Sequence, residues 1–312
     1  MNQTHTQGRI VGINWGSSNF RAYLIDADGK VVDAMEAAAG ITGLDRDGMV
    51  RHMASVAVRW PGASHIYACG MIGSNIGWID AGYVECPVAP GGLAQGLRET
   101  RIGEVDVRIV PGLACRRTRD NASDIMRGEE TELFGLLVSR RLPQSGIVAL
   151  PGTHTKWVRM EGGRVREFST AMSGEIFDRL TAAGLLASIV DGPAHASPAF
   201  FDGVRAGVRR DTGLGTLLFG ARAAVIRGDI KRSEGASYLR GLLIGSEVAD
   251  ARALFPELAE ASIPLVGTGP VCALYAAALT ELGIDSHAVE SREAIAQGFA
   301  AMHALHTGAV RA

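Results

Sequence analysis

The sequence contains the same pattern of strands and turns twice, and this repeat limits the possible folds more than any other feature. In the first half, an apolar strand ends in the turn Gly16-Ser17-Ser18-Asn19, and Gly29 separates the two strands that follow. In the second half, the turn Gly152-Thr153-His154-Thr155 takes the corresponding place, and Gly163 separates the later strands. Either hairpin alone is ordinary, because β-hairpins resemble one another. The pair together predicts a duplicated domain with a cleft between the copies.

The order of the remaining elements predicts an α/β fold with a mixed sheet in each half, because helices alternate with strands after each three-stranded meander. The predicted strands are 8–14, 20–26, 30–36, 64–69, 107–110, 147–150, 156–160, 164–169 and 263–266. The predicted helices are 47–59, 124–140, 174–186, 214–227, 237–254, 271–282 and 292–306. The segment 143–146 looks like a boundary, so we expect an N-terminal domain over 8–142 and a C-terminal domain over 143–312.

Composition excludes several classes of partner. The 312 residues suggest two domains, and 47% hydrophobic residues supply a core. A net charge of −2 gives no strong field for nucleic acid or an anionic membrane. Glu247 and Asp250 interrupt the most apolar run, so no stretch reaches membrane-spanning length. We expect a small-molecule partner, and a homo-oligomer remains open.

The cysteines and the N-terminus bear on localisation. Cys69, Cys86, Cys115 and Cys272 show no CxxC spacing, which argues against a zinc site and for reduced thiols. The polar segment 1–7 lacks the apolar region of a signal peptide. We therefore expect a cytoplasmic protein.

The two turns have the composition of an anion-binding site. Small residues leave backbone N–H groups accessible, and serine and threonine hydroxyls add donors, so two such turns across a cleft can hold a polyphosphate from both sides. A third turn, Gly267-Thr268-Gly269, lies between a predicted strand and helix, where a nucleoside can approach the backbone. Taken alone, this turn is as well explained by ordinary strand–helix packing. Lys156, directly after the second turn, is a candidate phosphate contact, although it can equally be a lysine at a strand edge.

Phosphoryl transfer also needs a group that accepts a proton. The segment "SDIMRGEETELFG" supplies four acids near a predicted helix start, and we expect Asp124 to be both the N-cap and the catalytic base. The alternative is that Asp124 only caps the helix. Glu129 and Glu130 can in the same way be solvated acids that complement the helix dipole.

The ordered set of motifs resembles a known family. The sequence "WGSSN", the acidic segment, "PGTHTKW" and "GTGP" resemble the sugar kinase/actin/Hsp70 superfamily. Within it, "GMIGSNIGW", "DIMRGEET", "LPGTHTKWV" and "LRGLLIGSE" are similar to the 2-dehydro-3-deoxygalactonokinase family, over about residues 9–305. The resemblance implies a two-domain actin-like ATPase/ribonuclease H-like fold with a central nucleotide cleft. It also implies ATP and Mg²⁺ as cofactors and phosphorylation of 2-dehydro-3-deoxy-D-galactonate to the 6-phosphate.

The acid substrate has a carboxylate and several hydroxyls, which cationic side chains, amides and backbone groups bind. The candidate substrate contacts are Ser74, Asn75, Trp78, Arg127 and Glu175. Trp78 can cover the sugar face or simply anchor its loop. Glu175 can accept from a hydroxyl or complement a helix dipole.

One position departs from the superfamily pattern. The first phosphate hairpin there usually begins with an aspartate that holds Mg²⁺ through water, whereas this chain has Asn14. An amide keeps the shape and loses the charge, so metal affinity should fall. Two other functions therefore stay open: another sugar or sugar-acid kinase, and a sugar or nucleotide sensor without catalytic activity.

Overall fold

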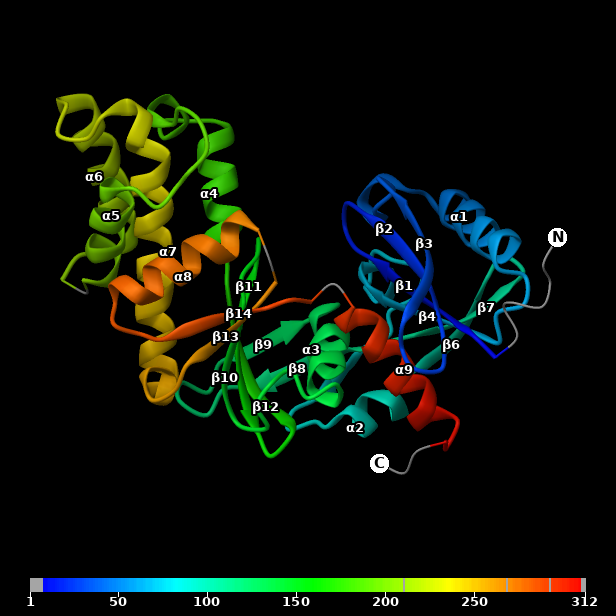
Figure 1. Ribbon diagram of the computed structural model, residues 1–312. Helices are drawn as coiled ribbons and strands as arrows, with labels where there is room; N and C mark the ends of the chain where they lie inside the picture. Colours follow the sequence, from blue (N-terminus) through cyan, green and yellow to red (C-terminus); the bar gives the residue numbers. More distant parts are fainter. Residues whose placement is uncertain (1–7, 210, 268, 292, 310–312) are drawn as a thin grey trace.

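The structure is a computed structural model that describes residues 8–209, 211–267, 269–291 and 293–309 (Figure 1). Its larger sheet has the strand order β3-β2-β1-β4-β7-β6. The bounds are β1 Ile10–Trp15, β2 Phe20–Ile25, β3 Val31–Ala37, β4 His65–Gly70, β6 Arg98–Ile102 and β7 Val105–Ile109. β1, β2 and β3 form an antiparallel meander, while β4 runs parallel to β1 and β7 runs parallel to β4.

The second sheet repeats this arrangement in the order β12-β11-β10-β13-β14. Its strands are β10 Gly146–Leu150, β11 Thr155–Glu161, β12 Arg164–Ala171, β13 Ile263–Val266 and β14 Ser286–Val289. The meander is again antiparallel, and β13 and β14 are again parallel to the strand at its end. The order and directions match those of β3-β2-β1-β4-β7, so the predicted duplication of mixed sheets is confirmed.

A third sheet was missed by the sequence analysis. It contains β5 Tyr83–Glu85, β8 Gly112–Arg116 and β9 Ser123–Met126, in the order β5-β8-β9. The helix predicted over 124–140 is therefore wrong at its start, because Asp124 pairs with Cys115 in this sheet. The helix itself, α3, spans Glu129–Val138 and begins after Gly128, whose φ of 108° ends the strand. Only glycine adopts such a φ easily.

Helices lie beside both larger sheets, and some of them lie between the two sheets (Figure 1). Their bounds are α1 Arg46–Arg59, α2 Pro90–Gln95, α3 Glu129–Val138, α4 Ser173–Ala182, α5 Pro198–Val208, α6 Leu214–Arg227, α7 Gly235–Leu254, α8 Pro270–Glu281 and α9 Ala294–His306. In Figure 1, α5, α6 and α7 lie on the side of the second sheet away from the larger sheet, whereas α3 and α9 lie between the sheets.

α3 and α9 join the two halves of the molecule. α9 contacts α3, α2, β1 and β2, so the end of the chain returns to the first sheet. One cluster of buried side chains runs through this region and includes Ile10, Phe134, Val148 and Phe299. The domain boundary at 142/143 stays a prediction. Among the described residues, the structure has no helix long and apolar enough to cross a membrane.

Candidate active site

The first predicted phosphate turn lies open at the end of β1. Its backbone closes through a bond from Gly16 N to Asn19 O (2.9 Å), and Ser17, Ser18 and Asn19 are exposed. The turn is held from behind, because the N–H and the hydroxyl of Thr42 both donate to Ser17 O, at 3.2 and 2.7 Å. The turn is therefore fixed, while its small side chains face outward.

A cavity joins this turn to the second one. Its volume is about 280 Å³. The lining residues are Asn14, Gly16, Ser17, Ser18, Asn19, Arg21 and Thr153. The structure thus brings together the first turn, the residue predicted to hold the metal, and one residue of the second turn. The combination of backbone donors, hydroxyls and an arginine is suited to an anion.

The second turn is tied to the helices that follow it. Glu175 N donates to Thr153 O at 3.0 Å, and His154 Nε2 lies 2.6 Å from the Glu175 carboxylate. This contact holds the pKa of Glu175 below its usual range. Thr155 is buried, and its hydroxyl bonds to Tyr275 at 2.8 Å. Thr155 therefore supports the turn from inside, and Thr153 is the threonine that lines the cavity.

The third predicted turn precedes α8. Gly267 and Gly269 have φ values of 118° and 92°, so both positions need glycine. Gly267 N donates to Val289 O at 3.0 Å, which fixes the turn to β14. Thr268 lies outside the described residues.

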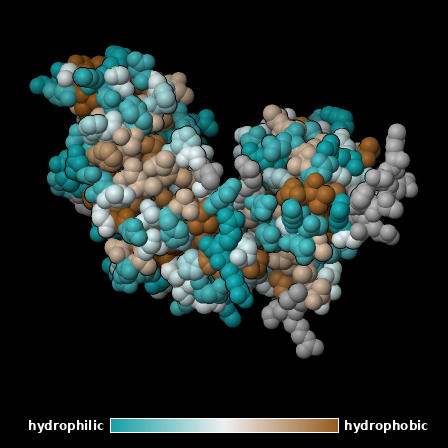
Figure 2. Space-filling view, in the orientation of Figure 1, coloured by the Kyte–Doolittle hydropathy of each residue, from teal (hydrophilic) through white to brown (hydrophobic). Residues whose placement is uncertain are grey.

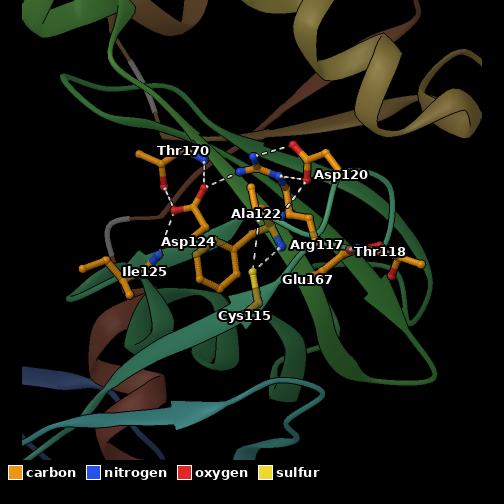
Figure 3. A network of polar contacts seen from close by, with 10 residues as sticks. Cys115, Arg117, Thr118, Asp120, Ala122, Asp124, Ile125, Glu167 and Thr170 are labelled. Carbon is orange, nitrogen blue, oxygen red and sulfur yellow. Dashed lines mark hydrogen bonds and ion pairs between the residues drawn. The ribbon is translucent and has the colours of Figure 1, made fainter.

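Asp124 takes a different position from the one predicted. It lies on β9, where both of its oxygens accept hydrogen bonds (Figure 3). Thr170 donates from its backbone N and from its hydroxyl, each at 2.7 Å. Arg117 and the backbone N of Ile125 donate at 3.1 and 2.8 Å. These contacts join β9 to β12, so Asp124 is not a helix cap and its carboxylate already has four donors.

The start of α3 lies next to the first turn. A Cβ atom on Gly128 would lie 3.5 Å from the Cα of Gly70, and one on Gly70 would lie 3.5 Å from Asn14 Oδ1. Glu129, the first residue of α3, makes an ion pair of 2.8 Å with Lys156. From the sequence, Lys156 is a candidate phosphate contact and Glu129 a solvated acid at the helix start. No local pattern pairs them, because they are 27 positions apart in the chain and come from different halves.

Glu130 is the next residue and is fully buried. Its carboxylate accepts from Gly128 N at 2.6 Å. Burial, with the charge of Glu129 as a second cause, raises the pKa of Glu130 to about 8. At neutral pH the Glu130 carboxyl is therefore mostly uncharged.

Three of the predicted substrate residues, Ser74, Asn75 and Trp78, belong to one loop. Ser74 is buried and its hydroxyl donates to Met71 O, while Asn75 is exposed on the same loop. Trp78 donates to Arg101 O at 3.1 Å, and the guanidinium of Arg46 lies 3.9 Å from its ring centre. These contacts match the interpretation of Trp78 as a loop anchor.

Arg127 lies beneath the same loop. Its side chain is 6% exposed and donates to Gly82 O at 3.0 Å, and the guanidinium lies 4.5 Å from the Tyr83 ring centre. Its Nε and Nη1 atoms are buried and have no hydrogen-bond partner among the described residues. Nη1 would lie 3.0 Å from a Cβ on Gly73. Arg127 thus has two free donors close to the loop predicted to bind the acid.

The donors around the cavity fit a magnesium–nucleotide complex better than a bare metal ion. The described part of the chain has no group of three or more His, Cys, Asp or Glu side chains that could hold a metal. Asn14 contributes one neutral oxygen at the cavity. A magnesium ion here would therefore take most of its ligands from phosphate and water.

Comparisons with known proteins give the family. A family model described as 2-keto-3-deoxy-galactonokinase matches residues 14–302. The 2-dehydro-3-deoxygalactonokinase of Escherichia coli (strain K12) is 32% identical over 291 residues, which are 93% of this chain and 96% of that protein. DgoK1 of Rhizobium meliloti (strain 1021), named for the same activity, is 38% identical over 306 residues, which are 95% of this chain and 97% of its own.

Solved structures agree with this result. A crystal structure of a Sinorhizobium meliloti protein named for the same activity has a TM-score of 0.85 and 33% identity, covering 97% of this chain and 100% of that one. Component A of the Acidaminococcus fermentans (R)-2-hydroxyglutaryl-CoA dehydratase has a TM-score of 0.51 and 14% identity, covering 97% and 99%. That second likeness shows the fold alone. The resemblance predicted from the motifs is confirmed: the chain belongs to the 2-keto-3-deoxy-galactonokinase family.

Proposed function

We infer that this chain transfers the γ-phosphoryl group of ATP to the 6-hydroxyl of 2-dehydro-3-deoxy-D-galactonate, as a cytoplasmic kinase of galactonate catabolism. The observation that carries this proposal is the family match over residues 14–302, combined with a cavity lined from both hairpin turns. The cavity supplies the donors that a polyphosphate needs, and the family supplies the substrate.

The nucleotide would lie along the three turns. Backbone N–H groups and hydroxyls of Gly16-Ser17-Ser18-Asn19 and of Thr153 would bind the phosphates, together with Lys156. The turn Gly267-Thr268-Gly269 would face the nucleoside, since glycine lets a flat ring approach the backbone. His154 pairs with Glu175 and would support the second turn.

Magnesium, when bound with ATP, spreads the charge that develops on the transferred phosphoryl group. Asn14 would contact it through water, because its amide lines the cavity. Ser74, Asn75 and Arg127 would bind the sugar acid, with the free donors of Arg127 nearest to the substrate loop. The role of Asp124 as proton acceptor stays a prediction, and it requires at least one of its four donors to give way.

A coupled assay of ADP release tests the function. The purified chain is given ATP, magnesium and one acid at a time: 2-dehydro-3-deoxy-D-galactonate, its gluconate epimer, and unmodified galactonate. We expect release with the first acid at a kcat/KM at least tenfold above the other two. A preference for another acid would support the alternative of a different sugar-acid kinase. Nucleotide binding without ADP release on any acid would support the sensor.

A further inference from the structure

The ion pair between Glu129 and Lys156 connects the two halves of the chain. Glu129 is the first residue of α3, and Lys156 lies on β11, directly after the second turn. Lys156 Nζ lies 2.8 Å from Glu129 Oε1 and also donates to His154 O at 2.9 Å. The lysine side chain is 5% exposed, so its charge is compensated mainly by this carboxylate rather than by water.

The second oxygen of Glu129 is not satisfied. Glu129 Oε2 is buried and has no hydrogen-bond partner among the described residues. A buried carboxylate oxygen without a donor costs free energy, so such an atom marks a position where a ligand or a moving group completes the contact. Glu130 does not compete for this role, because burial raises its pKa to about 8 and leaves it uncharged at neutral pH.

The two residues before Glu129 lie near the two predicted binding sites. On one side, Gly128 approaches Gly70, and Gly70 approaches the Asn14 amide that lines the phosphate cavity. On the other side, Arg127 lies beneath the loop predicted to bind the sugar acid, with Nη1 close to Gly73. The start of α3 therefore lies near both the end of β1, which leads into the first turn, and the loop predicted to bind the acid.

We propose that the Glu129–Lys156 ion pair is the resting state of the phosphoryl-transfer machinery, and that Glu129 is the catalytic base. The proposal rests on the proposed function. When ATP binds, Lys156 leaves Glu129 for the more highly charged phosphates. The freed carboxylate then takes the proton of the 6-hydroxyl as the new O–P bond forms and the bond from the γ-phosphorus to the ADP oxygen breaks.

This arrangement couples the base to the nucleotide. Lys156 occupies Glu129 Oε1 at 2.8 Å in the resting state, so this oxygen is open to a substrate hydroxyl only after Lys156 has moved to the phosphates. The base thus becomes active only after ATP is in place.

The test uses Glu129→Gln, which keeps the shape and removes the charge. Because ATP no longer has to break the ion pair, we expect the Kd of a non-hydrolysable ATP analogue with magnesium to fall about 3-fold. Turnover with the sugar acid should fall by roughly 10²- to 10⁴-fold, the range for a lost general base. Tighter nucleotide binding together with slower turnover is a combination that a merely structural residue does not produce.

Three further variants complete the experiment. Glu130→Gln is the matched control on the neighbouring residue, and at pH 7 it should leave both quantities near those of the wild type. Lys156→Gln should weaken analogue binding, which keeps the proposal testable even where Glu129→Gln does not fold by circular dichroism. Asp124→Asn tests the rival base and should retain more turnover than Glu129→Gln.

An unchanged analogue Kd in folded Glu129→Gln, or a turnover near that of the wild type, would overturn the proposal. Unchanged analogue binding in Lys156→Gln would overturn it as well. The binding measurements need no sugar acid, so they are independent of the proposed substrate. A wild-type chain that phosphorylates no acid would refute the proposed function. The binding of the ATP analogue to the variants could still be interpreted in that case.

Discussion

At the residue scale, charge is distributed unevenly over the first turn of α3. Glu129 and Glu130 are adjacent, yet one is paired with Lys156 and the other is fully buried. The sequence pattern marked both as dipole-complementing acids, and nothing local distinguishes them. The difference comes from contacts distant in sequence, such as the ion pair of Glu129 with Lys156 of β11.

Glu130 predicts a pH dependence of stability. Its pKa is about 8 in the folded protein and 4.5 when unperturbed. Because the folded value is raised, the stability that Glu130 contributes is fully present below about pH 4.5 and is lost as the pH rises through about 8. Glu130→Gln should thus gain up to about 2 kcal/mol relative to the wild type between pH 6 and pH 8. Urea denaturation at a series of pH values measures the free energy of unfolding of both proteins. The same change of this free energy with pH in the two proteins would contradict the prediction.

Asn14 predicts an altered magnesium requirement. Its amide lines the cavity, and an aspartate there would add a charge that attracts the cation. We expect Asn14→Asp to lower the magnesium concentration that gives half-maximal rate at fixed ATP. An apparent magnesium constant equal to that of the wild type would place the side chain outside the coordination shell of the metal and its waters.

The predicted helix-cap role of Asp124 is wrong for a specific reason. The residue follows small polar residues and precedes an apolar periodic run, which is a sound N-cap pattern. The segment instead forms a strand that pairs with β8, and Thr170 of β12 donates a hydrogen bond to the Asp124 carboxylate. Both partners are distant in sequence, so the local pattern cannot indicate them. By contrast, both hairpin turns were predictable, because small residues at a strand end encode the turn locally.

At the element scale, α5 and α7 pack through glycines. A Cβ atom on Gly241 would lie 2.1 Å from Phe200 O, and one on Gly203 would lie 2.2 Å from Tyr238 O. The backbones of the two helices are therefore so close at these positions that a side chain on either glycine would clash with the other helix. α5 was not predicted, since its two internal glycines lower its helix propensity and their purpose is visible only with α7 in place.

This contact predicts opposite effects for two similar substitutions. Gly241→Ala must push α5 from α7 and should destabilise the protein by roughly 1–3 kcal/mol. Gly220→Ala is the control: Gly220 is exposed on α6 with nothing within 4 Å of a Cβ, so alanine should stabilise the helix by about 1 kcal/mol. Chemical denaturation of both variants measures whether the free energy of unfolding falls in Gly241→Ala and rises in Gly220→Ala. A Gly241→Ala protein as stable as the wild type would show that the helices can separate without cost.

Elements with a strong local pattern were predicted closely. Helix 214–227 and strand 263–266 match α6 and β13 at both ends. The sequence did not predict short strands such as β5, β6, β8 and β9, because their three to five residues carry too little alternation to be recognised alone. They form because partners from elsewhere satisfy their backbone groups.

At the scale of the whole molecule, the duplicated sheets form two bodies with a hollow between them (Figure 2). The repeat could be predicted, because each copy encodes its own meander. The return of α9 to the first sheet could not, since it depends on the fit of Gly298 against Thr131 O on α3. Residues of the two turns line one cavity, which supports the proposed binding of a polyphosphate there.

The most direct test of the account identifies the product. The purified chain, ATP, magnesium and 2-dehydro-3-deoxy-D-galactonate labelled with ¹³C at C6 are incubated and followed by NMR. The account predicts that the C6 signal becomes split by phosphorus as one equivalent of ADP appears for each acid consumed. ADP formation without that splitting, or a C6 signal unchanged after ATP has been supplied in excess, would contradict it.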